Sequence, residues 1–181
     1  MSGEPTMLKP GDKATPFDLS AAIDGRIERV TLAAIRSEMI VLFFYPRDFS
    51  FVCPTEIIGF GKRLAQFTAE KTSVLGASLD SAESHRDWAR ELGGVYYPLL
   101  ADQGGRIARA YGVLDDTRGV ALRATFVIDS KRNIAYSLAS PVNVGRNVDE
   151  TLRVVQAIRS GQLCPSEWRP GDSFGPSELD F

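Results

Sequence analysis

Cys53 is the residue of this chain that is best placed to act as a nucleophile. It follows an apolar run, residues 39–45, which is typical of a strand buried on both faces. Pro46 ends that run, because proline cannot donate a hydrogen bond to a neighbouring strand. After Cys53 the apolar residues recur at the spacing of one helix face: Ile57, Phe60, Leu64 and Phe67. The pattern therefore places Cys53 at or near a helix N-terminus, just past the end of a central strand.

The cap of this helix has two candidates. Pro54 at the first helical position and Glu56 two residues later favour Cys53, whereas the hydroxyl of Ser50 favours an earlier start. Either start puts unpaired backbone N–H groups and the positive end of the helix dipole near the thiol, where they stabilise an anion. We therefore expect the Cys53 thiol to ionise more easily than a free cysteine. The alternative is an inert core cysteine that caps a helix.

Composition describes an ordinary globular chain. Its 181 residues are 44% hydrophobic and 24% charged, enough for one self-sufficient core. The formal charge of −2 gives no reason to expect nucleic acid or a membrane surface as a partner. The longest apolar run is too short to span a bilayer and the start shows no signal peptide, so we expect a cytoplasmic protein with reduced thiols. Two cysteines and one histidine show no metal-ligand spacing, so neither a metal nor another cofactor is expected.

The elements that must position Cys53 follow from short apolar runs and the turn residues between them. A turn at residues 130–133 between two strand-like runs predicts an antiparallel hairpin. Asn147 with Glu150 forms a capping-box pattern that opens a helix, and Gly161 ends it. The predicted strands are 17–19, 29–32, 39–45, 72–80, 97–102, 124–129 and 134–139, and the predicted helices are 53–67, 81–92, 105–111 and 147–161.

Together these elements predict an α/β fold. We expect a mixed central sheet with helices on both faces in a domain of residues 1–161, opened by a surface arm, residues 1–15. Residues 162–181 hold the second cysteine, Cys164, and form a C-terminal extension. Trp88 and Trp168 are interpreted as packing residues, and His85 as a residue on a helix surface without a role.

The motifs around these residues resemble those of a known family. They are Pro46, Ser50 and Cys53 at fixed spacing, Phe51-Val-Cys-Pro-Thr-Glu56, Arg123 within residues 121–129, Val144-Gly-Arg146 before Asp149-Glu150-Thr151, and Cys164-Pro165 ahead of Trp168. With them the chain resembles the typical two-cysteine peroxiredoxins, the thiol-specific antioxidant family that includes the peroxidase subunit of alkyl hydroperoxide reductase. The resemblance runs from about residue 7 to about residue 172.

This resemblance implies a thioredoxin-like fold and a thiol-dependent peroxidase that reduces hydrogen peroxide and organic hydroperoxides. It implies that Cys53 is the peroxidatic cysteine, oxidised to a sulfenic acid, and that Cys164 of the partner subunit resolves it as an intersubunit disulfide. The protein would then be a homodimer, with strand 134–139 as the isologous contact, and could assemble further into a ring such as a decamer. A thioredoxin-like protein or a flavoprotein disulfide reductase would recycle the disulfide.

The resemblance also assigns the residues around the thiol. Arg123 and the Ser50 hydroxyl would contact the peroxide oxygens, and Pro46 would exclude water. Glu56 and Arg146 would form a pair that holds the guanidinium in place. Without the resemblance, the arginines would be read as surface ion pairs and Ser50 as a helix cap. Ser50 stands where threonine is commoner, which keeps the hydroxyl but leaves its rotamer less restricted.

Ionisation of the thiol cannot by itself make a fast peroxidase. A free thiol is only ~3% ionised at pH 7, so nearly full ionisation gains ~30-fold in thiolate. The lower pKa also makes the thiolate about 10-fold less nucleophilic, which offsets most of that gain. Stabilisation of the transition state must therefore carry most of the rate, and this work is assigned to the hydrogen-bond donors.

Departures from the family pattern bear on over-oxidation of the thiol. Gly59 and Gly61 weaken the helix that opens with Cys53 by about 1 kcal/mol each relative to alanine. The loop at residues 93–98 is shorter than the Gly-Gly-Leu-Gly loop of relatives that are sensitive to over-oxidation. The C-terminal residues also lack the Tyr-Phe helix of those relatives. We expect resistance to over-oxidation. The alternative functions are a holdase or redox-signalling protein and a non-catalytic thioredoxin-like binding module.

Overall fold

A computed structural model describes residues 6–176 of the chain. Residues 1–5 of the predicted arm and 177–181 of the predicted extension lie outside the described residues. The described residues form two compact units that divide between Arg146 and Asn147. The division after residue 161 that we inferred from the sequence stays a prediction.

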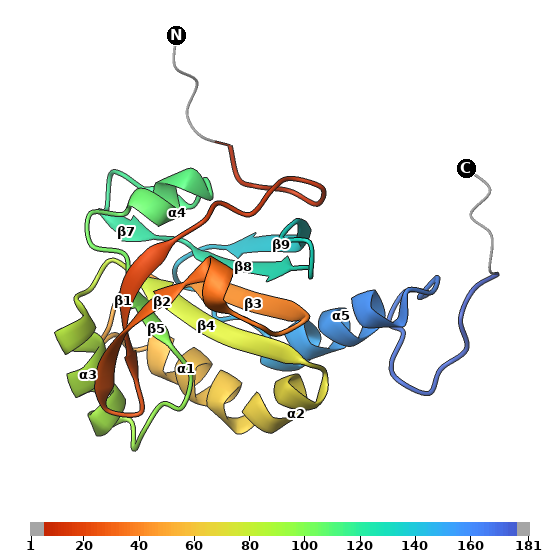
Figure 1. Ribbon diagram of the computed structural model, residues 1–181, viewed down its shortest axis with the longest axis horizontal. Helices are drawn as coiled ribbons and strands as arrows, with labels where there is room; N and C mark the ends of the chain where they lie inside the picture. Colours follow the sequence, from red (N-terminus) through yellow and green to blue (C-terminus); the bar gives the residue numbers. More distant parts are fainter. Residues whose placement is uncertain (1–5, 177–181) are drawn as a thin grey trace, which may run out of the picture. The chain divides into compact units, whose positions relative to one another are not determined.

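The first unit is built on a seven-stranded mixed sheet (Figure 1). The strands lie in the order β2-β1-β5-β4-β3-β8-β9, with β3, β4 and β5 parallel and the other pairs antiparallel. In chain order the elements are β1 (Asp18–Ile23), β2 (Arg26–Thr31), the 3-10 turn η1 (Leu32–Ala34), β3 (Met39–Phe44), α1 (Cys53–Lys62), α2 (Leu64–Ala69), β4 (Thr72–Ser78), α3 (Ala82–Glu91), β5 (Leu99–Ala101), α4 (Arg106–Ala110), β6 (Leu114–Asp115), β7 (Val120–Ala121), β8 (Arg123–Ile128) and β9 (Ile134–Ser140).

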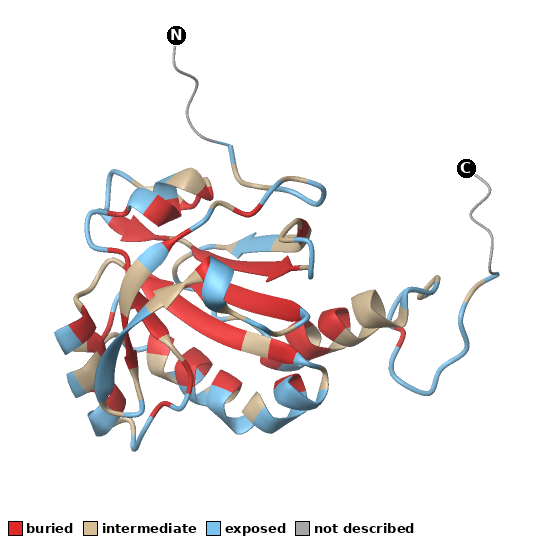
Figure 2. Cartoon of the chain, viewed as in Figure 1, coloured by how far each residue is buried: buried red, intermediate tan, exposed pale blue. Residues whose placement is uncertain are grey.

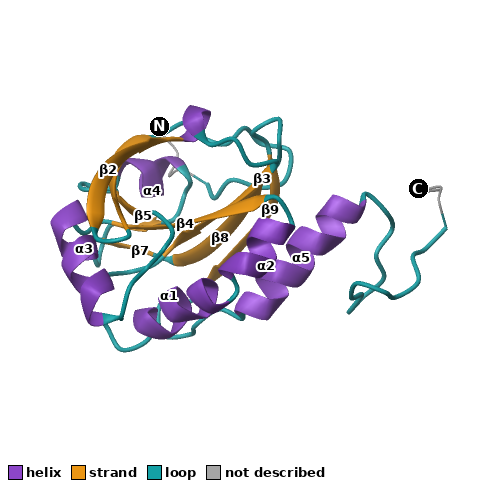
Figure 3. Ribbon diagram, turned by 60° about the horizontal axis from the view of Figure 1, so that its bottom comes forward, coloured by secondary structure: helices purple, strands orange, loops and turns teal. Residues whose placement is uncertain are grey.

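Strand β3 forms the centre of the core, and all six of its residues are buried (Figure 2). Its alternate side chains point to opposite faces. Phe44 joins the cluster that includes Ile107 of α4, whereas the ring of Phe43 stacks on Phe60 of α1 with centroids 4.2 Å apart. Helices therefore cover both faces of the sheet, as predicted (Figure 3).

The long helix predicted after Cys53 is interrupted. Helix α1 ends at Lys62 and α2 begins at Leu64, with Arg63 between them outside helical geometry (φ −106°, ψ 5°). The N–H of Arg63 donates to the Phe60 carbonyl, a contact one residue shorter than the α-helical bond, which tightens the last turn. The predicted apolar face survives the break, because Phe60 and Phe67 remain buried with ring centroids 6.0 Å apart.

The topology of the sheet brings three segments that are distant in the sequence to the same end of the strands, where β3 ends. Strand β8 is antiparallel to β3 and pairs Ala124 with Phe44, so the start of β8 lies beside the end of β3. Strand β9 is antiparallel to β8 and pairs Ser140 with Arg123, so the end of β9 lies beside the start of β8. The loop after β3, the first residue of β8 and the segment after β9 therefore converge there.

The second unit opens with α5 (Val148–Ser160), and its predicted caps are confirmed. The side chain of Asn147 accepts the N–H of Glu150 at 3.1 Å, and Gly161 ends the helix in the left-handed conformation with φ 64°. Beyond the helix, the Cys164 sulfur is partly buried, 3.4 Å from the Ser160 hydroxyl. No helix within residues 6–176 is long and apolar enough to cross a membrane.

Candidate active site

Cys53 is the first residue of α1, and its side chain is fully buried. The Ser50 hydroxyl accepts the backbone N–H of Cys53 at 3.3 Å, although the residue that precedes the helix is Val52, which makes no side-chain cap. Both sequence indications therefore hold in part: the helix begins at Cys53, and Ser50 satisfies its first N–H. Both cysteines of the chain are free thiols.

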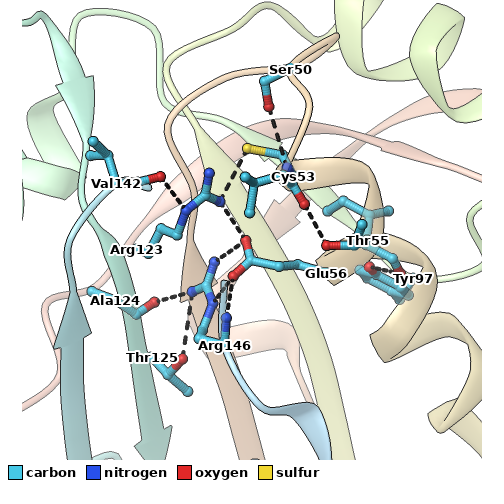
Figure 4. A network of polar contacts seen from close by, with 12 residues as sticks. Ser50, Cys53, Thr55, Glu56, Tyr97, Arg123, Ala124, Thr125, Val142 and Arg146 are labelled. Carbon is cyan, nitrogen blue, oxygen red and sulfur yellow. Dashed lines mark hydrogen bonds and ion pairs between the residues drawn. The ribbon is translucent and has the colours of Figure 1, made fainter. Parts of the chain in front are cut away.

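Arg123 is the cation nearest to the Cys53 sulfur (Figure 4). Its Nη1 lies 3.2 Å from the sulfur and donates to Glu56 Oε2 at 2.6 Å, while its Nε donates to the Val142 carbonyl at 2.7 Å. The side chain is only 3% exposed. The guanidinium is therefore fixed beside the sulfur by acceptors from two other segments, and it stabilises negative charge there.

Glu56 also holds a second arginine (Figure 4). Arg146 donates from Nε and Nη2 to the two carboxylate oxygens at 2.9 and 2.8 Å, and from its backbone N–H at 2.9 Å. Its Nη1 donates to the Ala124 carbonyl at 2.8 Å, and its guanidinium lies 5.0 Å from the centre of the Phe43 ring. The Arg146 side chain is 1% exposed, so neither arginine of this cluster forms the surface ion pair weighed as the alternative.

The ionisation of Glu56 follows from these contacts. Burial opposes the charged carboxylate, but the hydrogen bonds and charge of Arg146, followed by the charge of Arg123, outweigh it. They hold the pKa of Glu56 below its usual range. Glu56 is therefore a carboxylate at neutral pH and joins two cations.

A pocket of about 390 Å³ opens beside this cluster. The predicted residues Pro46, Ser50 and Arg123 all line it, and Arg47, Arg118, Val120 and Val142 complete the lining. Six predicted site residues, all of the first unit, thus come together at this end of the strands: Pro46, Ser50, Cys53, Glu56, Arg123 and Arg146. Cys164 belongs to the second unit.

The sequence did not reveal four residues of the pocket. Arg118 and Val120 belong to the short β6–β7 hairpin, which no apolar run predicted. Arg47 follows Pro46 directly, and that position was the one signal available for it. Val142 contributes a backbone carbonyl, for which residue type carries no signal.

His85 was wrongly placed on a helix surface; it is fully buried. Its Nδ1 lies 2.8 Å from Asp48 Oδ2 and 3.2 Å from the Tyr45 hydroxyl, and its Nε2 lies 3.0 Å from the Leu100 carbonyl. His85 shares the buried face of α3 with Trp88, three residues later, a spacing that could have revealed it. The contact ties the loop after β3, through Asp48, to helix α3.

Comparisons with known proteins give consistent results. The profile of the AhpC/TSA family matches residues 10–137. Peroxiredoxin prdx-2 of Caenorhabditis elegans is 44% identical, covering 97% of this chain and 94% of its own length. The structure is similar to that of a reduced 2-Cys peroxiredoxin of Plasmodium vivax, with a TM-score of 0.85 and 34% identity over 94% of this chain and 93% of that one. It is also similar to AhpC of Mycobacterium tuberculosis, with a TM-score of 0.83 and 36% identity over 90% of this chain and 99% of that one. These likenesses confirm the predicted thioredoxin-like fold.

We predict that Glu56→Gln destabilises the protein at pH 7 by about 3–5 kcal/mol, because it leaves two buried cations without their shared anion. The folded-state pKa of Glu56 is lowered, so its contribution is complete above the unfolded value of about 4.3 and is lost as the pH falls through the folded value. The difference between wild type and variant in urea unfolding should therefore shrink below about pH 4.

Glu150→Gln is the matched control, because Glu150 pairs with Arg153 near the surface of the second unit. It should change the free energy of unfolding little at any pH. Equal destabilisation by the two substitutions would contradict the role assigned to Glu56.

Proposed function

The chain belongs to the AhpC/TSA family and is a thiol peroxidase of the peroxiredoxin type, and from this premise we propose that Cys53 reduces hydroperoxides and Cys164 resolves the product. The substrates would be hydrogen peroxide and small organic hydroperoxides. The observation that carries this assignment is the contact of 3.2 Å between the Arg123 guanidinium and the sulfur of a buried cysteine at a helix N-terminus.

In the first step the Cys53 thiolate attacks one oxygen of the hydroperoxide. The O–O bond breaks, the sulfur becomes a sulfenic acid, and the other oxygen leaves as water or an alcohol after it takes up a proton. Negative charge develops on the leaving oxygen during this step. Arg123 and the Ser50 hydroxyl, which line the pocket beside the sulfur, are placed to donate to it.

The buried setting of Arg123 supports its role. Arg123 is held on three sides before any substrate arrives, so it needs little reorganisation during the reaction. Pro46 is buried in the wall of the pocket and keeps water from the thiol. Glu56 and Arg146 fix the orientation of Arg123 from behind, which makes them positioning residues.

In the second step the sulfenic acid of Cys53 condenses with Cys164 of the partner subunit, forming a disulfide and releasing water. Cys53 is fully buried, so α1 must open locally before a second sulfur can reach it. Strand β9 is the last strand of the sheet order, and Leu138 on it is 43% exposed, which supports an isologous homodimer through this edge. Rings of such dimers, as in a decamer, remain part of the proposal.

The cycle closes when an external dithiol reduces the disulfide. We propose a thioredoxin-like protein or a flavoprotein disulfide reductase as that reductant, and a cytoplasmic location where such reductants keep thiols reduced. Residues 162–181 would act as the extension that carries the resolving cysteine.

A non-reducing gel with intact-mass analysis tests this cycle directly. After one equivalent of hydrogen peroxide, the reduced wild type should form a covalent dimer, which Cys53→Ser and Cys164→Ser should both abolish. Cys164→Ser should instead carry a sulfenic or sulfinic adduct on Cys53. A wild type that stays monomeric with Cys53 oxidised would remove Cys164 from the mechanism, and an unreactive wild type would overturn the peroxidase assignment of Cys53.

Arg123→Lys should lower the single-turnover rate with hydrogen peroxide by roughly 10²–10³-fold. Lysine keeps the charge but cannot donate at once to the sulfur, to Glu56 and to the Val142 carbonyl. Rapid-mixing measurement of thiol loss gives the rate. Arg29→Lys on strand β2, where Arg29 pairs with Asp18 at the surface, is the control and should react like the wild type. A rate for Arg123→Lys within twofold of the control would contradict the proposal.

Gly61→Ala should make Cys53 easier to over-oxidise. A Cβ at Gly61 meets nothing within 4 Å, so alanine should stabilise α1 by about 1 kcal/mol and reduce its local opening about fivefold. Disulfide formation should slow, and mass spectrometry should detect more sulfinic acid at a given peroxide concentration.

The control for this measurement is Thr68→Ala, which favours helix in α2 and leaves α1 untouched. The wild type itself should resist over-oxidation. Inactivation of the wild type by millimolar peroxide within a few turnovers would contradict that expectation, and equal sulfinic acid in Gly61→Ala and wild type would contradict the role of α1 opening.

A further inference from the structure

The pocket beside Cys53 is much larger than hydrogen peroxide. A water molecule occupies about 30 Å³ in the liquid, so two bonded oxygens need roughly 60 Å³, about a sixth of the 390 Å³ present. The remaining space has apolar walls, because Pro46, Val120 and Val142 line it. The pocket therefore has room for the organic group of a larger hydroperoxide.

Three guanidinium-bearing residues line the same pocket: Arg47, Arg118 and Arg123. Arg123 pairs with Glu56 behind it. Arg118 pairs with Asp115 at 3.0 Å within the β6–β7 hairpin. Arg47 is exposed, and the structure records no hydrogen bond or ion pair for it among residues 6–176.

Asp80 carries a carboxylate near Arg47 but forms no recorded ion pair with it. Asp80 lines an adjoining pocket together with Arg47. One carboxylate oxygen of Asp80 accepts both the Ser78 hydroxyl at 2.6 Å and the backbone N–H of Asp48 at 3.0 Å, and no ion pair with Arg47 is recorded. Within residues 6–176, the mouth of the pocket thus carries an exposed guanidinium without a recorded ion pair, beside apolar walls.

We propose that this pocket prefers organic hydroperoxides that carry a carboxylate. The inference rests on the proposed function and extends it to a substrate class. The peroxide group reaches Cys53, the hydrocarbon part lies along Val120 and Val142, and the carboxylate is bound by Arg47 with help from Arg118. The carboxylate takes no part in the reaction, in which the O–O bond breaks, the distal oxygen joins the sulfur and the hydroxy acid leaves.

The test compares an alkyl hydroperoxide that bears a terminal carboxylate with its methyl ester, which has the same chain without the charge. The quantity of interest is the ratio of kcat/KM for the acid to that for the ester. In the wild type we expect a ratio of about 3–10 at low salt, falling as salt screens the charge. The double variant Arg47→Gln/Arg118→Gln should bring the ratio close to 1, with Arg47→Gln alone giving the larger part of the change.

Two controls make the result specific to the pocket. Arg29→Gln removes the same charge from strand β2, outside the pocket lining, and should leave the ratio as in the wild type. Hydrogen peroxide, which has no carboxylate, reports on the Cys53 reaction in every sample. A general loss of activity lowers kcat/KM for the acid and the ester by the same factor and therefore cancels from their ratio.

A wild-type ratio of 1, or a ratio unchanged in the double variant, would overturn the inference while leaving the peroxidase assignment intact. An equal fall in Arg29→Gln would also overturn it, because the effect would then come from net charge. Failure of the wild type to consume hydrogen peroxide would instead overturn the proposed function itself.

Discussion

The site depends on one carboxylate buried between two guanidinium groups. Glu56 accepts hydrogen bonds from both Arg123 and Arg146, and all three side chains are at least 97% buried. Such charges are expensive to bury unless they are paired. One anion between two cations leaves a net positive charge, and Arg123 directs it toward the Cys53 sulfur. The cluster is therefore held together by its own pairing and still attracts negative charge at the Cys53 sulfur.

The sheet explains why this cluster can form from residues far apart in the sequence. Glu56 and Arg146 are 90 residues apart. Antiparallel pairing of β8 with both β3 and β9 brings their segments to the same end of these strands. Arg123 stands on strand β8, where its backbone pairs with Ser140 of β9. The loop between β3 and α1 is fixed separately, through the buried contact of Asp48 with His85. A strand thus carries Arg123, while Cys53 stands on a helix that contains two glycines.

The parts of the fold that the sequence predicted are those set by local interactions. The caps of α5 and the β8–β9 hairpin follow from residues a few positions apart, and both are confirmed. The break at Arg63 was missed because the apolar spacing continues across it. The partners that bury His85 were missed because Asp48 and the Leu100 carbonyl are distant in the sequence. Apart from Cys53, which its placement before a helix indicated, the site residues were found through motif resemblance; residue type alone favoured surface ion pairs for the arginines and a helix cap for Ser50. Their assigned roles remain proposals.

In the proposed cycle, reduction of the peroxide and resolution of the sulfenic acid place opposite demands on Cys53. The first needs a buried sulfur close to Arg123, since donors are most effective where water is excluded. The second needs that sulfur exposed to another cysteine. Instability in α1 satisfies both demands, because Arg123 and Arg146 are anchored to the carbonyls of Val142 and Ala124, which α1 does not contain. When α1 opens, Glu56 leaves with it, and these carbonyl contacts are what can keep both guanidinium groups in place until the helix reforms.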